Sequence, residues 1–237
     1  MIPWLDHHRL QFPPVAQALR EPNGLLAAGG DLSPNRVLAA YRQGIFPWFM
    51  PGEPILWWSP NPRMVLYPAE LHIHRSLAKV IRNRPYRISF DQAFAQVMMA
   101  CAEPRTGQAG TWISPEMLDA YIALHGAGYA HSVECWMDDE LVGGLYGMAI
   151  GKMFYGESMF ARRADASKIA FVHAVQWLQQ QGFGLIDCQM YTDHLARFGA
   201  KTIEREQFVS ELDALTAHHD LLGPWHYRYE SSGGQCS

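Results

Sequence analysis

The feature that most constrains the fold of this chain is a strand–helix–strand pattern within residues 143–194. In the run Leu185–Gln189, apolar and polar residues alternate with the period of a β-strand. Because residues two apart on a strand point to the same face, the side chains of Asp187 and Gln189 are predicted to lie side by side. A helix-length run over residues 167–181 precedes this strand. Polar side chains at the ends of the strands in a strand–helix–strand unit indicate an active site.

Composition and charge limit the class of protein. The 237 residues are 49% hydrophobic and 18% charged, which is typical of a globular protein with a sizeable core. The formal net charge is −4, so a nucleic-acid-binding site would have to be a local patch. No apolar run approaches the roughly 20 residues of a membrane-spanning helix, and residues 1–9 do not resemble a signal peptide. Four scattered cysteines predict reduced thiols in a cytoplasmic protein.

The chain is predicted to contain two domains. Residues 1–62 are rich in Pro, Gly and aromatic side chains, and only residues 33–43 have the signals of a helix. Strands are expected within residues 130–155, directly before the strand–helix–strand pattern, and the tail after residue 217 is expected to be frayed. This order predicts an α+β protein, with a small N-terminal α/β domain (1–62) followed by a mixed-sheet, acetyltransferase-like domain (63–237).

A basic surface is predicted on a helix over residues 71–84. Arg75, Lys79 and Arg82 recur at spacings of four and three, so they share one helix face, and Arg84 follows. Such a face is commonly just solvated. The alternative is that it binds the phosphates of a nucleic acid, and it is the best candidate for that role in a chain of negative net charge.

Neither a cofactor nor a metal ion is predicted. A coenzyme A-dependent acetyltransferase needs a glycine-rich turn at a helix N-terminus to hold the pyrophosphate, and residues 159–167 contain no glycine. Acyl transfer from another donor is therefore favoured over acetyl transfer. A non-catalytic nucleic-acid-binding module is the other alternative. His72 and His74 could share one face of a strand, but no third metal ligand has convincing spacing.

Several motifs in this chain resemble those of the leucyl/phenylalanyl-tRNA–protein transferases. They occupy residues 20–27, 29–33, 44–49, 55–60, 110–113, 156–160 and 185–189, in one register. The resemblance implies an enzyme that moves Leu, Phe or Met from aminoacyl-tRNA to the N-terminal Arg or Lys of a protein, which marks that protein for degradation in bacteria. The implied partners are the aminoacyl-tRNA and the acceptor protein, with no membrane, and the enzyme is expected to be a monomer.

The resemblance implies that Asp187, Gln189 and Glu157 are catalytic. The attacking α-amine has a pKa of roughly 7.7 to 8.0, so a polarised proton acceptor is sufficient. Either the Gln189 carboxamide oxygen accepts the amine proton while Asp187 polarises the carboxamide, or Asp187 is the base and Gln189 stabilises the oxyanion. Glu157 would either orient Gln189 or receive the cationic side chain of the acceptor.

The resemblance also implies an aminoacyl pocket, with Trp48 and Trp112 at its mouth and with Leu145, Met159, Phe171 and Ile186 inside. Such side chains suit Leu, Phe and Met and exclude β-branched residues. The tRNA is expected to bind at Arg75, Lys79, Arg82 and Arg84. Relatives are expected to carry aromatic rings at the positions of Ala174 and Leu178, and we expect Trp177 and Phe171 to fill that volume instead.

Overall fold

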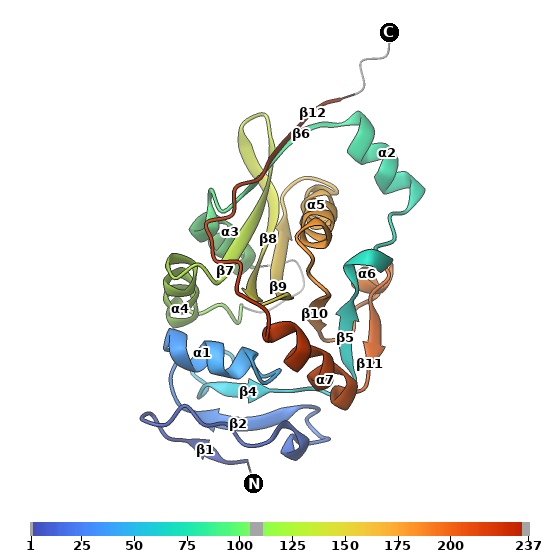
Figure 1. The fold of residues 1–237 in the computed structure, drawn as a ribbon. Helices are drawn as coiled ribbons and strands as arrows, with labels where there is room; N and C mark the ends of the chain where they lie inside the picture. Colours follow the sequence, from blue (N-terminus) through green and yellow to red (C-terminus); the bar gives the residue numbers. More distant parts are fainter. Residues whose placement is uncertain (1, 105–110, 234–237) are drawn as a thin grey trace.

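The computed structural model describes residues 2–104 and 111–233, which form two β-sheets covered by helices (Figure 1). The smaller sheet has four strands in the order β1–β2–β4–β3. The larger has eight, in the order β11–β5–β10–β9–β8–β7–β6–β12. This confirms the predicted α+β class with a mixed sheet.

The smaller sheet is built from the part of the chain that is rich in Pro, Gly and aromatic residues. Its strands are β1 (Trp4–Leu5), β2 (Leu25–Gly29), β3 (Phe46–Pro47) and β4 (Leu56–Trp58), and a short 3₁₀ helix, η1, covers Val15–Gln17. The helix expected over residues 33–43 is present as α1 (Pro34–Tyr41). The strands were not predicted because runs of two to five residues are too short to show a period.

The larger sheet contains the predicted strand–helix–strand unit. Its strands are β5 (Arg63–Leu66), β6 (Pro85–Phe90), β7 (Ala130–Met137), β8 (Glu140–Ile150), β9 (Met153–Ala161), β10 (Leu185–Gln189), β11 (Lys201–Ile203) and β12 (Arg228–Ser232). β9 and β10 pair in parallel and are joined by α5 (Ala166–Gln180); the other neighbours are antiparallel. The predicted connection is therefore confirmed.

Helices cover both faces of this sheet, and each face has its own core. The remaining helices are η2 (Pro68–Glu70), α2 (Arg75–Asn83), α3 (Phe94–Ala102), α4 (Pro115–Gly126), α6 (Asp193–Ala196) and α7 (Arg205–Thr216). Along β8, Tyr146 and Met148 pack with α1, α3, α4 and α7, whereas Leu145 and Ala149 pack with α2 and α5. This alternation is the two-residue period of a strand buried on both faces.

Two expectations about elements were wrong. The amphipathic pattern of residues 89–102 predicts a helix over that range, but the helix begins only at Phe94, because β6 continues to Phe90 and Asp91 turns the chain with φ of 56°. The described part of the tail, residues 218–233, is not frayed, since β12 pairs with β6 over five residues. Both errors concern strand pairing between distant segments. No helix in the described part of the chain has the length and apolar character needed to cross a membrane.

Candidate active site

A cavity opens where the two parallel strands of the larger sheet separate. The pairing of β9 with β10 ends at Tyr155 and Asp187, although β9 continues to Ala161. The cavity at this point has a volume of about 1080 Å³. It contacts Tyr146 from one core and Leu145 from the other, so it reaches both faces of the sheet.

All six residues predicted for the aminoacyl pocket line this cavity, namely Trp48, Trp112, Leu145, Met159, Phe171 and Ile186. Their exposure fits the predicted arrangement, because Trp48 is 46% exposed whereas Phe171 is 6% exposed. Trp48 is held at the mouth by an edge-to-face contact with Trp58, at 5.5 Å between ring centroids. Their role in binding substrate stays a prediction.

One wall of the cavity comes from α5, which turns the side chains of Phe171, Ala174 and Leu178 toward it. The expectation that Trp177 fills this volume was wrong. The Trp177 ring lies 4.5 Å from Trp225 and 5.2 Å from Phe90, in the core behind the helix. Among the α5 residues that line the cavity, only Phe171 is aromatic.

Glu157 reaches the cavity through a β-bulge. The register between β8 and β9 shifts so that Tyr146 faces Ser158 while Gly147 faces Gly156, which leaves Glu157 as the extra residue. A bulge of this kind re-aims one side chain. Burial raises the pKa of Glu157 to about 7.

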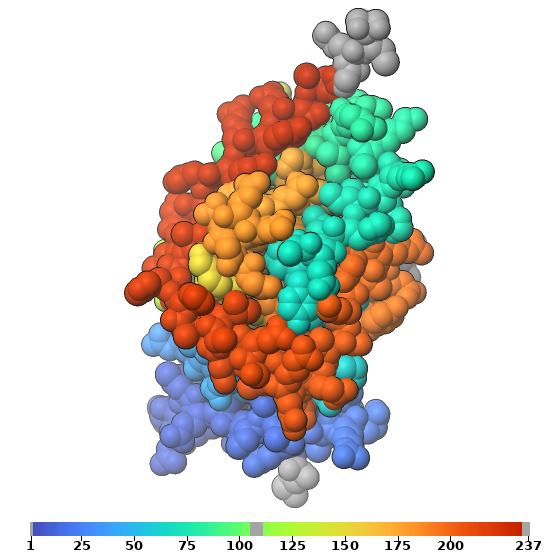
Figure 2. All heavy atoms as spheres, turned by 45° about the vertical axis from the view of Figure 1, so that its right-hand side comes forward, coloured from blue at the N-terminus to red at the C-terminus, as the bar shows by residue number. Residues whose placement is uncertain are grey.

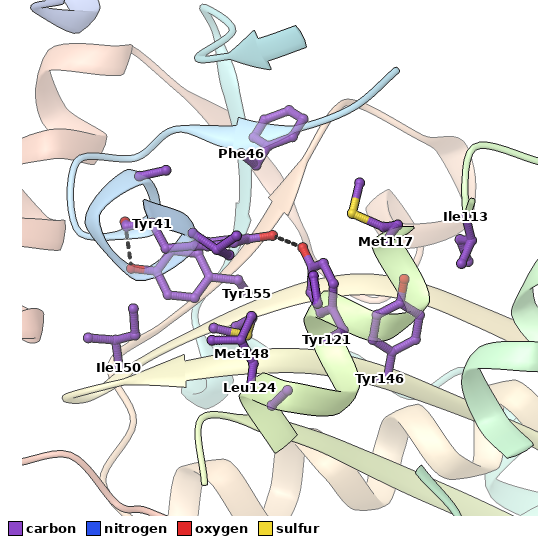
Figure 3. Close-up of a cluster of buried hydrophobic side chains, with 14 of the residues drawn as sticks. Tyr41, Phe46, Ile113, Met117, Tyr121, Leu124, Tyr146, Met148, Ile150 and Tyr155 are labelled. Atoms are coloured by element: carbon purple, nitrogen blue, oxygen red, sulfur yellow. Dashed lines mark hydrogen bonds between the residues drawn. The ribbon is translucent and has the colours of Figure 1, made fainter. Parts of the chain in front are cut away.

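Two buried tyrosines contact the carboxylate of Glu157. The Tyr41 hydroxyl donates to Oε1 at 2.6 Å, and the Tyr121 hydroxyl donates to Oε2 at 3.3 Å. The two phenol oxygens are themselves 2.5 Å apart. Figure 3 draws the contact between these hydroxyls. Neither tyrosine was singled out in the sequence, because α1 and α4 are brought together only by the fold.

Gln189 also contacts Glu157, through a carboxamide nitrogen that donates to Oε1 at 3.2 Å. The prediction that the side chains of Gln189 and Asp187 lie side by side was wrong. The Asp187 carboxylate accepts the backbone N–H of Gln189 at 2.8 Å. The reason is local: Gln189 has φ of 61° and the register with β5 shifts there, so the strand period breaks.

Asp187 forms a buried ion pair that was not predicted. Arg63 Nε and Nη2 donate to its two carboxylate oxygens at 2.8 and 2.6 Å, and both side chains are at most 1% exposed. The Arg63 guanidinium also stacks over the rings of Phe46 and Phe208. Asp187 is thus absent from the cavity lining, whereas Gln189 and Glu157 are part of it. The sequence did offer one signal for this ion pair, because an arginine at the start of the apolar strand β5 is seldom buried without a charged partner.

The predicted basic face of α2 is exposed beside α5, turquoise next to amber in Figure 2. Among the described residues, no acidic side chain pairs with Arg75, Lys79 or Arg82. Arg84 differs, because it is half-buried and donates to the Ala164 carbonyl at 2.5 Å. Within residues 2–104 and 111–233, no three His, Cys, Asp or Glu side chains are grouped to hold a metal ion.

Known proteins match this chain along most of its length. The family model described as leucyl/phenylalanyl-tRNA protein transferase matches residues 65–213, and the model of its N-terminal domain matches residues 30–61. The leucyl/phenylalanyl-tRNA–protein transferase of Chromobacterium violaceum is 62% identical over 234 residues, which cover 98% of this chain and 100% of that protein. This chain belongs to the leucyl/phenylalanyl-tRNA–protein transferase family. As a member, it is an aminoacyltransferase.

A second relative belongs to the same family. The leucyl/phenylalanyl-tRNA–protein transferase of Nitrosomonas eutropha is 62% identical over 92% of this chain and 93% of its own length. Among solved structures, a GCN5-related N-acetyltransferase from Kribbella flavida aligns with 14% identity and a TM-score of 0.33, over 70% of this chain and 59% of that one. That score is too low to support an argument about function. The division at residue 62 stays a prediction.

Proposed function

We propose that this enzyme transfers Leu, Phe or Met from aminoacyl-tRNA to the α-amino group of an N-terminal Arg or Lys, forming a peptide bond and marking the acceptor protein for degradation. Membership of the family supports the general reaction, which is aminoacyl transfer from tRNA to proteins. The observation that carries the proposal is the cavity between β9 and β10, where apolar side chains meet the Gln189–Glu157 pair. Action in the cytoplasm stays a prediction.

The apolar side of the cavity is the proposed site for the donor side chain. Leu145, Phe154, Phe171 and Ile186 are buried and line it, and Met159 adds a flexible thioether. An unbranched or aromatic side chain can extend into such a space, whereas a β-branched one carries bulk next to the reacting ester. Discrimination by shape alone amounts to about 10- to 200-fold. The small Ala174 leaves additional room for a ring.

The polar side of the cavity is the proposed reaction site. The acceptor amine attacks the ester carbonyl, the C–N bond forms, and the 3′ oxygen of the tRNA leaves with a proton. Holding both partners in attack geometry can contribute an effective molarity of about 10⁵ to 10⁸ M. We assign the Gln189 carboxamide oxygen as the acceptor of the amine N–H, because its nitrogen is held by Glu157. The pairing with Arg63 disfavours Asp187 as the base and supports a role in holding the Gln189 backbone.

The exposed face of α2 is the proposed tRNA-binding surface. Arg75, Lys79 and Arg82 have no acidic partner in the described part of the chain, so their charges are available to phosphates. Arg84 is already engaged with a backbone carbonyl and would contribute less.

The test is transfer of radiolabelled Leu, Phe, Met, Ile or Val from charged tRNA to peptides that begin with Arg, Lys or Ala. We expect transfer of the first three amino acids to Arg and Lys peptides, and its loss in Gln189→Ala. Gln179→Ala is the matched control, because Gln179 is an exposed α5 residue outside the cavity. No transfer by folded wild-type protein that still binds tRNA would contradict the proposal and leave a tRNA-binding module.

A further inference from the structure

Two buried tyrosines from separate parts of the chain converge on one cavity residue. Tyr41 is the last residue of α1 and Tyr121 lies within α4, and both side chains are fully buried. The Tyr41 hydroxyl lies 2.6 Å from one oxygen of the Glu157 carboxylate, and the Tyr121 hydroxyl lies 3.3 Å from the other. The contact between the two hydroxyls is drawn in Figure 3. Burying phenol groups around a carboxylate is costly unless the polar atoms are hydrogen-bonded, as the hydroxyls of Tyr41 and Tyr121 and both oxygens of Glu157 are here.

The contacts of Glu157 define how the Gln189 carboxamide is turned. An ionised carboxylate is only an acceptor, so it must face the NH₂ group of Gln189 and not the carbonyl oxygen. The Gln189 nitrogen is the atom found 3.2 Å from Glu157. The hydrogen bonds that Gln189 forms with other described residues use its backbone N–H and its carboxamide nitrogen, and Gln189 lines the cavity. The oxygen is therefore available to a substrate N–H.

We propose that Tyr41 and Tyr121 are positioning residues for aminoacyl transfer, which keep Glu157 ionised so that it holds the Gln189 carboxamide with its oxygen available to the acceptor amine. This inference rests on the proposed function, and on the role of Gln189 in it. Neither tyrosine is expected to touch the substrate. Each acts through Glu157.

The ionisation of Glu157 is finely balanced, which gives the tyrosines their importance. The pKa of Glu157 is raised to about 7 as the net result of opposing effects. Burial, the largest effect, and the charge of Asp187 raise the pKa, whereas the hydrogen bonds from Tyr41 and Tyr121 and the charge of Arg63 lower it. The titratable and charged groups that face Glu157 are Tyr41 of α1, Tyr121 of α4, Tyr146 of β8, Asp187 of β10 and Arg63 of β5. A protonated Glu157 would donate a hydrogen bond and favour the opposite orientation of the carboxamide.

The experiment measures single-turnover transfer of Phe to an Arg peptide between pH 5.5 and 9, at saturating tRNA and peptide, for wild type, Tyr41→Phe and Tyr121→Phe. Loss of one hydrogen bond to a charged group should raise the midpoint of the acid limb by about one pH unit or more. We therefore expect roughly a tenfold loss of rate below the wild-type midpoint and recovery of most of the rate only at about pH 9.

Two further variants separate positioning from simple stability. Tyr155→Phe removes a phenol of the same cluster that donates to the backbone carbonyl of Tyr41 at 3.0 Å and does not contact Glu157. It should lower the melting temperature and leave the midpoint of the acid limb unchanged. Glu157→Gln removes the titrating group, so a tyrosine substitution in that background should cause no further shift.

The outcomes distinguish this inference from the function on which it rests. Equal losses of rate at every pH in Tyr41→Phe and Tyr121→Phe, with unshifted midpoints, would overturn the positioning role alone. If one of the two variants does not fold, the other decides. Absence of transfer by the wild-type protein would overturn the proposed function and this inference with it.

Discussion

Asp187 and Arg63 form a bidentate ion pair that is shielded from solvent between β5 and β10. Removing one partner of such a pair leaves an unpaired buried charge. We expect Arg63→Met to lower the free energy of unfolding by about 3 to 5 kcal/mol, measured by urea denaturation. The double variant Arg63→Met, Asp187→Asn should lose less than the sum of the two single variants.

Lys201→Met is the matched control for this measurement. Lys201 pairs with Glu70 at 2.8 Å, and both side chains are about half exposed, at 49% and 50%. A change below about 1 kcal/mol is expected. If Arg63→Met cost no more than Lys201→Met, the buried pair would not stabilise the fold. Loss of activity in any Asp187 variant should be interpreted only after its stability is known.

Glu134 is a second buried carboxyl group, and it gives the stability a pH dependence. It accepts hydrogen bonds from the hydroxyls of Ser89 and Ser132, and burial raises its pKa from 4.5 to about 7. Between these values the folded protein holds a proton that the unfolded chain has released, so the free energy of unfolding falls as the pH rises.

Substitution Glu134→Gln removes this titration. We expect the wild-type protein to lose stability relative to Glu134→Gln as the pH rises from about 4.5 to 7, and the difference to level off above that range. Urea unfolding of both proteins at pH 5, 6, 7 and 8 measures it. A difference that stays constant over this range would contradict the raised pKa of Glu134.

At the scale of elements, α2 is anchored on one side and free on the other. Leu77 is buried in the core shared with α5, whereas Arg75, Lys79 and Arg82 face solvent. Reversing the three charges to Glu should weaken binding of charged tRNA. It should also make the slope of log K against log salt concentration less steep. The slope should fall by up to about one for each phosphate that the variant no longer neutralises.

Arg42→Glu is the control for this prediction, because Arg42 follows α1 and pairs with Asp220. Fluorescence anisotropy of labelled tRNA between 50 and 200 mM salt, a range over which phosphate binding changes affinity strongly, measures both proteins. Equal affinities and equal slopes for the α2 variant and wild type would exclude α2 from the tRNA interface.

The divergence of β9 and β10 shows what a local pattern can and cannot predict. The alternation in Leu185–Gln189 correctly predicted a strand, because a two-residue period is a local property. It could not predict the turn of Gln189 out of that strand, or the bulge at Glu157, since both depend on the register with neighbouring strands. The six pocket residues were reached through the family resemblance and not through periodicity.

At the scale of the whole molecule, the C-terminal segment completes the core behind α5. Trp225 is 4% exposed, stacks on His131 at 3.5 Å and lies 4.5 Å from Trp177. We expect Trp225→Ala to lower the free energy of unfolding by about 3 to 5 kcal/mol, and to lower the melting temperature measured by calorimetry. Leu222→Ala, in the same segment but 50% exposed, should change either quantity little. Equal effects would show that the segment is not part of the core.

The sequence by itself determined the central strand–helix–strand unit and the family, because helix and strand periods and contiguous motifs are carried by neighbouring residues. Tertiary structure alone decided which distant side chains meet. Arg63 and Asp187 are separated by 124 residues, and Tyr41 and Glu157 by 116. Such contacts depend on strand register and helix packing across the molecule. For that reason the catalytic candidates could be named from the chain, whereas the groups that hold them in place could not.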